Sequence, residues 1–362
     1  MTTSVYIHIP FCKSKCHYCS FVSFNKLELK TEYIKALQKE ISNFYDGEIL
    51  KTIYFGGGTP STLGINEFMQ ILKLLKPAPD AEVTTELNPE GVNYDYARRL
   101  LDCGINRVSL GCQTFNDEIL KQINRRHSSK QVEEAVETLQ NAGFDNISLD
   151  FIYGLPNQTQ EMFKNDLKQA VDLGIQHISL YGLKLEEGCF FYNHLPANLP
   201  DDDMQADMYL GAIETLSKLG FEHYEVSNFC KHGFESKHNL TYWNNDEYYG
   251  FGVAAHGYKN STRYSNKDSL ENYIQNPIEH SDEKLLSQSE KLEEEIFLGL
   301  RKMCGIDINE INSKYNIDFD AKYNKILKKY LNINLIKKTT KGYAFTPQGV
   351  LVSNVILADF IE

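Results

Sequence analysis

The sequence lacks the long apolar runs, the excess of positive charge and the dense cysteine pattern that mark three large classes of protein. Its 362 residues hold no apolar stretch near the roughly 18–20 residues of a membrane-spanning helix. Acidic residues outnumber basic ones, 49 to 37, which argues against a general nucleic-acid binder because such proteins carry a basic surface. Residues 1–12 show no basic stretch followed by an apolar one, so we expect no signal peptide and a cytoplasmic protein.

Cysteine is sparse, with eight residues in the whole chain. A cytoplasmic protein rarely uses them as structural disulfides. Three of them, Cys12, Cys16 and Cys19, form a CxxxCxxC motif directly after the first predicted strand. Three thiolates leave one iron of a [4Fe–4S] cluster open, since full ligation takes four cysteines. The alternative is a zinc site completed by His17 or by a distant residue. The other five are expected to be small buried side chains: Cys103, Cys112, Cys189, Cys230 and Cys304.

Short β-branched and aromatic runs alternate with amphipathic stretches over the first 220 residues. The strand-like runs are Ser4–Ile9, Lys51–Phe55, Glu82–Leu87, Arg107–Cys112, Asn146–Tyr153 and His177–Leu183. The helical stretches are Lys30–Tyr45, Asn66–Leu75, Tyr94–Asp102, Lys130–Ala142 and Gln160–Leu173, and Gly104, Gly143 and Gly174 stand at three helix ends. This alternation predicts the α/β class, as a partial (β/α)6 TIM-like barrel with reactive groups at the carboxyl ends of its strands.

Beyond the barrel the pattern changes twice. We expect a barrel core over residues 1–220, ending in a helix at about Asp201–Leu219. Residues 221–285 form an extension rich in aromatic residues and histidine. Residues 286–362 begin with a charged helix and contain a predicted hairpin around Lys341–Tyr343, which favours a small helical or winged-helix-like C-terminal domain.

The segment Tyr6–Cys12, which reads YIHIPFC, together with Cys16 and Cys19, resembles the radical SAM superfamily. It is most similar to the branch that holds oxygen-independent coproporphyrinogen III oxidase and the haem chaperone family HemW. The resemblance implies that the three cysteines bind a [4Fe–4S] cluster whose open iron chelates S-adenosylmethionine (SAM). In that superfamily one electron from the reduced cluster cleaves SAM to a 5′-deoxyadenosyl radical.

Further motifs of the same resemblance follow later strands. They include a glycine run at 56–58, the segment Gly111–Asn116 and Asp150 inside an apolar strand, where a carboxylate is costly unless it is hydrogen-bonded. Without the resemblance, most of these residues would be interpreted as turn formers or solvated charges. The residues that the resemblance implies for SAM binding are Tyr6, Tyr18, Gly57, Gly58, Thr59, Glu86, Gln113, Arg125 and Asp150.

Two departures separate this chain from the coproporphyrinogen-converting enzymes. Those enzymes carry a fourth cysteine two residues after the third, where this chain has Phe21. They also have a long extension before the first tyrosine of the motif, whereas Tyr6 is almost at the start here. Both departures match HemW and argue against an oxidase activity, so no catalytic residue is assigned.

A second motif, His238–Trp243, resembles the HNxxYW motif that is linked to haem binding in HemW. A neutral imidazole is a common axial ligand of haem iron, so His238 is the predicted haem ligand. The alternative is that His238 and Trp243 only fix a loop over the barrel mouth. His256 is a second candidate, with a structural role in the core or a loop as its alternative.

The function that these motifs favour is a HemW-like haem chaperone. The resemblance implies three cofactors or ligands, namely a [4Fe–4S] cluster, SAM and haem. It also implies delivery of haem to apo-haemoproteins such as respiratory enzymes, and it allows a homodimer. The alternatives are a radical SAM enzyme that acts on a porphyrin in porphyrin biosynthesis and a radical SAM methyltransferase.

Overall fold

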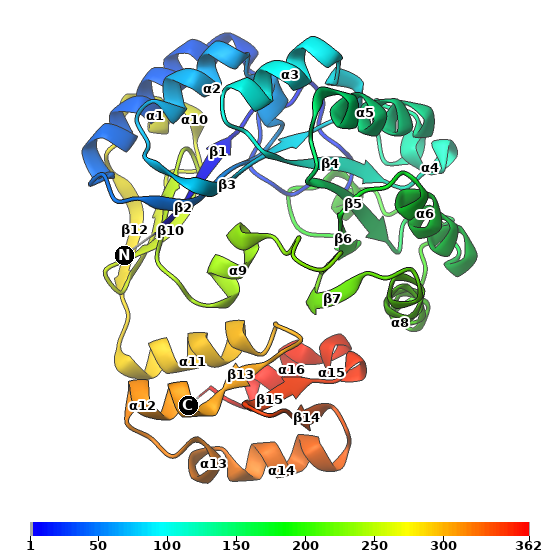
Figure 1. Ribbon diagram of the computed structural model, residues 1–362, viewed down its shortest axis with the longest axis vertical. Helices are drawn as coiled ribbons and strands as arrows, with labels where there is room; N and C mark the ends of the chain where they lie inside the picture. The colour runs from blue at the N-terminus through cyan, green and yellow to red at the C-terminus, as the bar shows by residue number, and fades with distance from the viewer. Residues whose placement is uncertain (1–2, 362) are drawn as a thin grey trace.

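The computed structural model describes residues 3–361, so the domain ends predicted at residues 1 and 362 lie outside it. A single curved sheet runs through the larger part of the chain, with helices on its outer side (Figure 1). Among the described residues this sheet has 12 strands in the order β12-β11-β10-β9-β1-β2-β3-β4-β5-β6-β8-β7.

The centre of the sheet is parallel from β1 to β6, as the strand–helix alternation predicted. These strands are β1 (Thr3–Ile9), β2 (Leu50–Gly57), β3 (Pro77–Leu87), β4 (Arg107–Gln113), β5 (Ile147–Tyr153) and β6 (His177–Gly182). Most of their residues are buried, because helices cover one face and the barrel interior covers the other. The predicted partial (β/α)6 barrel is confirmed.

Helices α1 to α6 and α8 pack outside the barrel strands (Figure 1). The helices of this part are α1 (Lys30–Phe44), α2 (Ile65–Leu72), α3 (Tyr94–Asp102), α4 (Asp117–Gln122), α5 (Ser129–Ala142), α6 (Gln160–Asp172), α7 (Phe190–Asn193) and α8 (Asp202–Lys218), with short 3₁₀ turns at Leu27–Leu29, Pro60–Thr62 and Pro89–Gly91. Gly104, Gly143 and Gly174 all have positive φ after a helix, which confirms the three predicted stops.

The extension lengthens the sheet at both edges. Its elements are β7 (Glu222–Glu225), β8 (Asn228–Cys230), α9 (Lys237–Trp243), β9 (Tyr248–Phe251), β10 (His256–Lys259), β11 (Thr262–Asn266), α10 (Leu270–Gln275) and β12 (His280–Leu285). Strand β9 pairs parallel to β1, and β8 pairs antiparallel to β6. The chain therefore crosses from one edge of the barrel to the other through α9.

The C-terminal part lies below the barrel in Figure 1 and has its own buried apolar cluster, from Leu292 to Phe360. Its elements are α11 (Gln288–Gly299), β13 (Ile306–Asp307), α12 (Ile308–Tyr315), α13 (Phe319–Lys322), α14 (Asn324–Asn332), β14 (Ile336–Lys338), β15 (Gly342–Phe345), α15 (Pro347–Leu351) and α16 (Ser353–Ala358). The predicted hairpin is β14–β15, and a short β13 joins it on the other side.

No helix in the part of the chain that the structure describes has both the length and the apolar character to cross a bilayer.

Candidate cluster and cofactor site

The cysteine motif lies on the loop that follows β1, at the carboxyl end of the strand. Two hydrogen bonds close this loop, from the Phe24 amide to the Pro10 carbonyl at 2.7 Å and from the Cys12 amide to the Phe24 carbonyl at 3.1 Å. A 3.2 Å bond from the Cys19 amide to the Cys16 carbonyl tightens the turn inside it. The loop therefore projects the three thiols from a fixed base.

The thiols are half-buried and reduced. Burial raises the pKa of the Cys19 thiol to about 11, and it also raises the pKa of the Cys12 thiol. A thiolate at either position is therefore costly unless a cation or a metal centre compensates its charge.

The spacing of the thiols bears on the kind of metal centre. Around one zinc ion, sulfurs bonded at about 2.3 Å lie about 3.8 Å from one another. Among residues 3–361, the group of three candidate ligands whose atoms all lie within 4.8 Å of one another is Glu222, His232 and Glu235, and it contains no cysteine. The three cysteine sulfurs do not form such a group as they stand. His17, the candidate fourth zinc ligand, engages the Gln122 carbonyl through Nδ1 at 2.9 Å.

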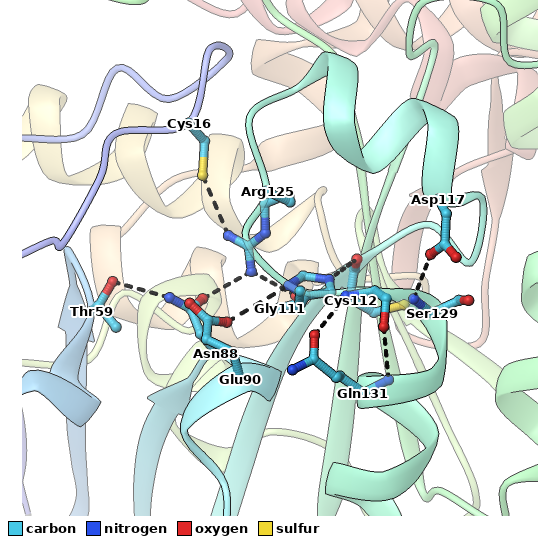
Figure 2. Close-up of polar contacts among 12 residues, drawn as sticks. Cys16, Thr59, Asn88, Glu90, Gly111, Cys112, Asp117, Arg125, Ser129 and Gln131 are labelled. Atoms are coloured by element: carbon cyan, nitrogen blue, oxygen red, sulfur yellow. Dashed lines mark hydrogen bonds and ion pairs between the residues drawn. The ribbon is translucent and has the colours of Figure 1, made fainter.

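Arg125 connects the cysteine loop to the barrel strands, as Figure 2 shows. Its guanidinium donates to Cys16 Sγ at 3.4 Å, to Asn88 Oδ1 at 2.8 Å and to the Gly111 carbonyl at 2.8 Å. Burial acts to lower the pKa of Arg125, but Tyr18 and Cys16 raise it, and it ends above its ordinary value. A fixed positive charge therefore lies against one sulfur of the motif.

The same network continues to a second sulfur through Thr59. Asn88 Nδ2 donates to Thr59 Oγ1 at 3.4 Å, and that hydroxyl lies 3.4 Å from Cys12 Sγ. Asn88 was not among the predicted site residues. It follows Glu86 by two positions at the same strand end, and this placement at a carboxyl end was the signal that could have identified it.

The glycine run at the end of β2 lies against β1 and the cysteine loop. A side chain at Gly57, whose φ is +113°, would place a Cβ 2.5 Å from the His8 ring. A Cβ at Gly58 would lie 2.9 Å from the Phe11 carbonyl oxygen. The Gly58 and Thr59 amides donate to the Ile9 and Phe11 carbonyls, both at 2.8 Å. Close backbone contact therefore requires glycine here, and Thr59 is held beside the loop.

Two carboxylates face the barrel interior. Glu86 accepts from the Tyr54 hydroxyl at 2.9 Å and from the Gly57 amide at 3.2 Å, and Asp150 accepts from Ser109 at 2.9 Å. Desolvation, and then the charge of Asp150, raise the pKa of Glu86 to about 7. Desolvation also raises the pKa of Asp150. Both groups suit a ligand that brings hydroxyl or ammonium donors.

Gln113, at the end of β4, has a strained backbone. Its φ is +69°, which is uncommon for a residue with a side chain, and the residue is 8% exposed. Such conformations cost about 1–3 kcal/mol and cluster at ligand sites. The strain is consistent with a specific orientation of this side chain at the strand end.

Tyr6 lies on β1, and Tyr18 belongs to the cysteine loop itself. The His8 Nε2–H donates to the Val22 carbonyl at 2.9 Å, so His8 Nδ1 accepts from the Tyr6 hydroxyl at 3.1 Å. Burial lowers the pKa of His8 to about 4, so the imidazole is neutral. Burial raises the pKa of Tyr18 well above its ordinary value. Tyr18 packs beside the apolar cluster that contains Ile152 and Leu155.

His238, the predicted haem ligand, is enclosed instead of open to a ligand. It is 1% exposed, its Nδ1 lies 2.7 Å from Thr52 Oγ1, and its Nε2 lies 2.8 Å from the Tyr242 hydroxyl. Its ring stacks on Tyr54 with centroids 4.9 Å apart. Burial lowers its pKa to about 3. Iron ligation by His238 would first require one of these hydrogen bonds to break, and the role stays a prediction.

The residues present fit a [4Fe–4S] cluster with SAM. Three free thiols in one motif, without a fourth cysteine in it, meet the donor set of a cluster with one open iron. The nearby Arg125 supplies positive charge beside Cys16 Sγ.

Comparisons with known proteins identify the family of this chain. The profile of the Radical SAM superfamily matches residues 6–170, and that of the HemN C-terminal domain matches residues 286–352. The protein named Heme chaperone HemW of Lactococcus lactis is 40% identical over 368 residues, which cover 99% of this chain and 97% of that protein. The Heme chaperone HemW of Bacillus subtilis is 37% identical over 374 residues, with 99% of each chain covered.

Among solved structures, coproporphyrinogen III oxidase from Escherichia coli, described as a radical SAM enzyme, superposes with a TM-score of 0.87. The match covers 99% of this chain and 90% of that chain at 23% sequence identity, so it shows a shared fold.

Proposed function

This chain belongs to the radical SAM superfamily and, within it, to the haem chaperone family HemW, and from this membership we propose that it binds haem and delivers it to apo-haemoproteins. Haem is the cargo in this proposal. The [4Fe–4S] cluster and SAM are resident groups of the same molecule.

The observation that carries the proposal is the cysteine loop together with Arg125. Cys12, Cys16 and Cys19 would hold three irons of the cluster, and Arg125 would hold the loop to the barrel through its bond to Cys16 Sγ. Thr59 and Gln113 would orient SAM at the strand ends. When bound together, cluster and SAM supply one-electron chemistry.

The remaining predicted contacts surround that space. Gly57 and Gly58 allow close approach to the backbone, and Glu86 and Asp150 offer acceptors for the donors of SAM. Tyr6, on β1, and Tyr18, on the cysteine loop, would complete the SAM contacts.

Phe21 supports a chaperone over an oxidase. It occupies the position of the fourth cysteine in the coproporphyrinogen-converting enzymes, and its side chain is 68% exposed. An exposed phenylalanine offers no ligand to iron and presents an apolar surface to solvent.

We also propose that the protein works in the cytoplasm, because its eight cysteines are all free thiols, as in a reducing compartment. The clients in this proposal are apo-haemoproteins such as respiratory enzymes, and a homodimer is the proposed assembly.

Two parallel assays on the anaerobically reconstituted protein test the function. One titrates haem and follows its transfer to an apo-haemoprotein by the absorption spectrum of the acceptor. The other supplies coproporphyrinogen III, SAM and a reductant and measures the decarboxylated product. We expect haem transfer without decarboxylation. Efficient decarboxylation, or the absence of haem binding, would contradict the chaperone function.

A further inference from the structure

An open hollow lies between the cysteine loop and the extension. Its volume is about 350 Å³, within the range of ligand pockets. Tyr6 on β1, Phe21 on the cysteine loop, Tyr242 on α9 and Tyr248 on β9 contribute aromatic walls. His256, the first residue of β10, also lines it. His8 lines it too, but its ring nitrogens are engaged by the Val22 carbonyl and the Tyr6 hydroxyl. The hollow therefore combines flat aromatic surfaces with one imidazole, that of His256, to which a ligand has access.

His256 differs from His238 in being available to a ligand. It is exposed, and neither of its ring nitrogens makes a hydrogen bond to another residue within the described range 3–361. An imidazole that lines a hollow without a protein partner retains a lone pair for a metal. His238 has both nitrogens engaged, as described above.

The backbone that carries His256 is firmly built. A Cβ at Gly250 would lie 1.8 Å from the His256 carbonyl oxygen, so β9 and β10 approach too closely for any residue but glycine. The preceding turn contains Ala254 with a φ of +56°, an uncommon conformation for alanine. Ala254 also lines the hollow. A strained turn beside a ligand site is a recurrent sign of a functional position.

A buried carboxylate anchors this turn from behind. Glu40 on α1 accepts from the Gly252 amide at 2.8 Å and also from the Tyr273 hydroxyl and the Asn266 amide. Asn266 in turn donates to the Gly252 carbonyl at 2.8 Å. The position of His256 is therefore fixed from the core, and metal binding there would need little reorganisation.

We propose that this hollow is the haem site and that His256, instead of His238, is the protein ligand of the haem iron. This inference rests on the proposed function and names its binding residue. In this proposal Phe21, which stands where related enzymes have a fourth cysteine, packs against one face of the macrocycle and so contributes to haem binding. The exposure of Phe21 and His256 leaves part of the macrocycle in solvent, which suits a cargo that must be released.

Haem titration of the reconstituted protein tests the proposal, with difference spectra against the haem-free protein and resonance Raman spectra to identify the axial ligand. The variants are His256→Ala and His238→Ala, with His232→Ala as the matched control because His232 is also exposed. We expect His256→Ala to bind haem at least about tenfold more weakly and to lose the histidine-ligated spectrum. Added imidazole should restore that spectrum, which a merely structural effect would not allow. His232→Ala should match the wild type.

The outcomes separate the two proposals. If the wild type binds no haem, the proposed function fails and this inference fails with it. If the wild type binds haem and His256→Ala keeps its affinity and its spectrum, only the inference is overturned. It is also overturned if His238→Ala alone loses the histidine-ligated spectrum and recovers it with imidazole. Phe21→Ala should weaken binding while the iron and sulfide content of the cluster is unchanged; wild-type affinity in this variant would remove Phe21 from the site.

Discussion

Arg125 should set the reduction potential of the cluster by its charge. Its Nη1 lies 3.4 Å from Cys16 Sγ, and it is the cation that contacts this sulfur. Replacing it with methionine keeps an unbranched apolar side chain and removes the charge. Because the reduced cluster carries one more negative charge than the oxidised one, loss of a nearby cation destabilises the reduced state. The potential of Arg125→Met should therefore fall.

The magnitude follows from the distance. A unit charge at 3.4 Å contributes about 1.2 kcal/mol at the dielectric constant of water and about 5 kcal/mol at an effective value of about 20. For transfer of one electron, about 1.4 kcal/mol corresponds to about 60 mV. The expected fall is thus about 50 to 200 mV.

A spectroelectrochemical titration of the reconstituted protein measures this shift. Arg126→Met is the matched control, because Arg126 is the neighbouring residue and is exposed, so its potential should stay near that of the wild type. Arg125→Lys keeps the charge but loses the guanidinium that donates to Asn88 and to the Gly111 carbonyl. It should therefore shift the potential less than Arg125→Met does. An unchanged potential in Arg125→Met with full cluster content would refute the reasoning, as would an equal fall in Arg126→Met.

Three further predictions concern other residues. Serine at Cys12, Cys16 and Cys19 together should abolish the visible absorption and the iron content of the reconstituted protein; iron at the wild-type level would place the cluster elsewhere. Burial raises the pKa of Glu40 from 4.5 to about 7, so the native state binds this proton more tightly than the unfolded chain. Stability should therefore fall as pH rises through about 7, by about 3 kcal/mol in total. Urea unfolding between pH 5 and 8 should show a larger loss in the wild type than in Glu40→Gln, in which Glu86 and Glu225, whose pKa values burial also raises to about 7, still contribute. Equal pH dependence in both proteins would contradict the prediction. Phe21→Cys should not acquire coproporphyrinogen oxidase activity, and detection of the decarboxylated product would show that this single residue separates the two activities.

The barrel was predictable because its strands and helices follow strong periodic patterns. Strands β1 to β6 are apolar and β-branched, and the helices between them carry one apolar face, so each element begins and ends within a few residues of the prediction. β3 is the exception. It begins at Pro77 instead of Glu82, because its first four residues, PAPD, are mostly exposed and include two prolines, which carry no strand pattern.

The extension was not predictable in this way. Strands β9 and β10 have four residues each and are rich in tyrosine and glycine, which is too short a run for a periodic signal. Their place in the sheet depends on close backbone contacts, such as that of Gly250 with the His256 carbonyl. Those contacts exist only after the chain has returned to β1 from the opposite edge of the barrel.

Within the candidate site, the sequence motifs predict which residues carry the chemistry but not how they are connected. Arg125 and Thr59 were predicted as separate SAM contacts, whereas the structure joins them through Asn88 into a chain of hydrogen bonds between the thiols of Cys16 and Cys12. Sequence spacing cannot reveal such a chain, because its members come from different strands. The folded barrel brings the strand ends together, and only then does the role of Asn88 become visible.

The same reasoning explains how the motif at His238–Trp243 can govern haem binding without supplying the ligand. His238 Nε2 is bonded to the Tyr242 hydroxyl, and Tyr242 forms a wall of the hollow that His256 lines. Loss of His238 would release this tyrosine and leave a polar hydroxyl without its buried partner, which costs about 1–3 kcal/mol. The wall would then lose its fixed position. An effect of His238 on haem affinity is therefore expected even when His256 holds the iron, and only the axial-ligand spectrum and its recovery with imidazole distinguish the two roles.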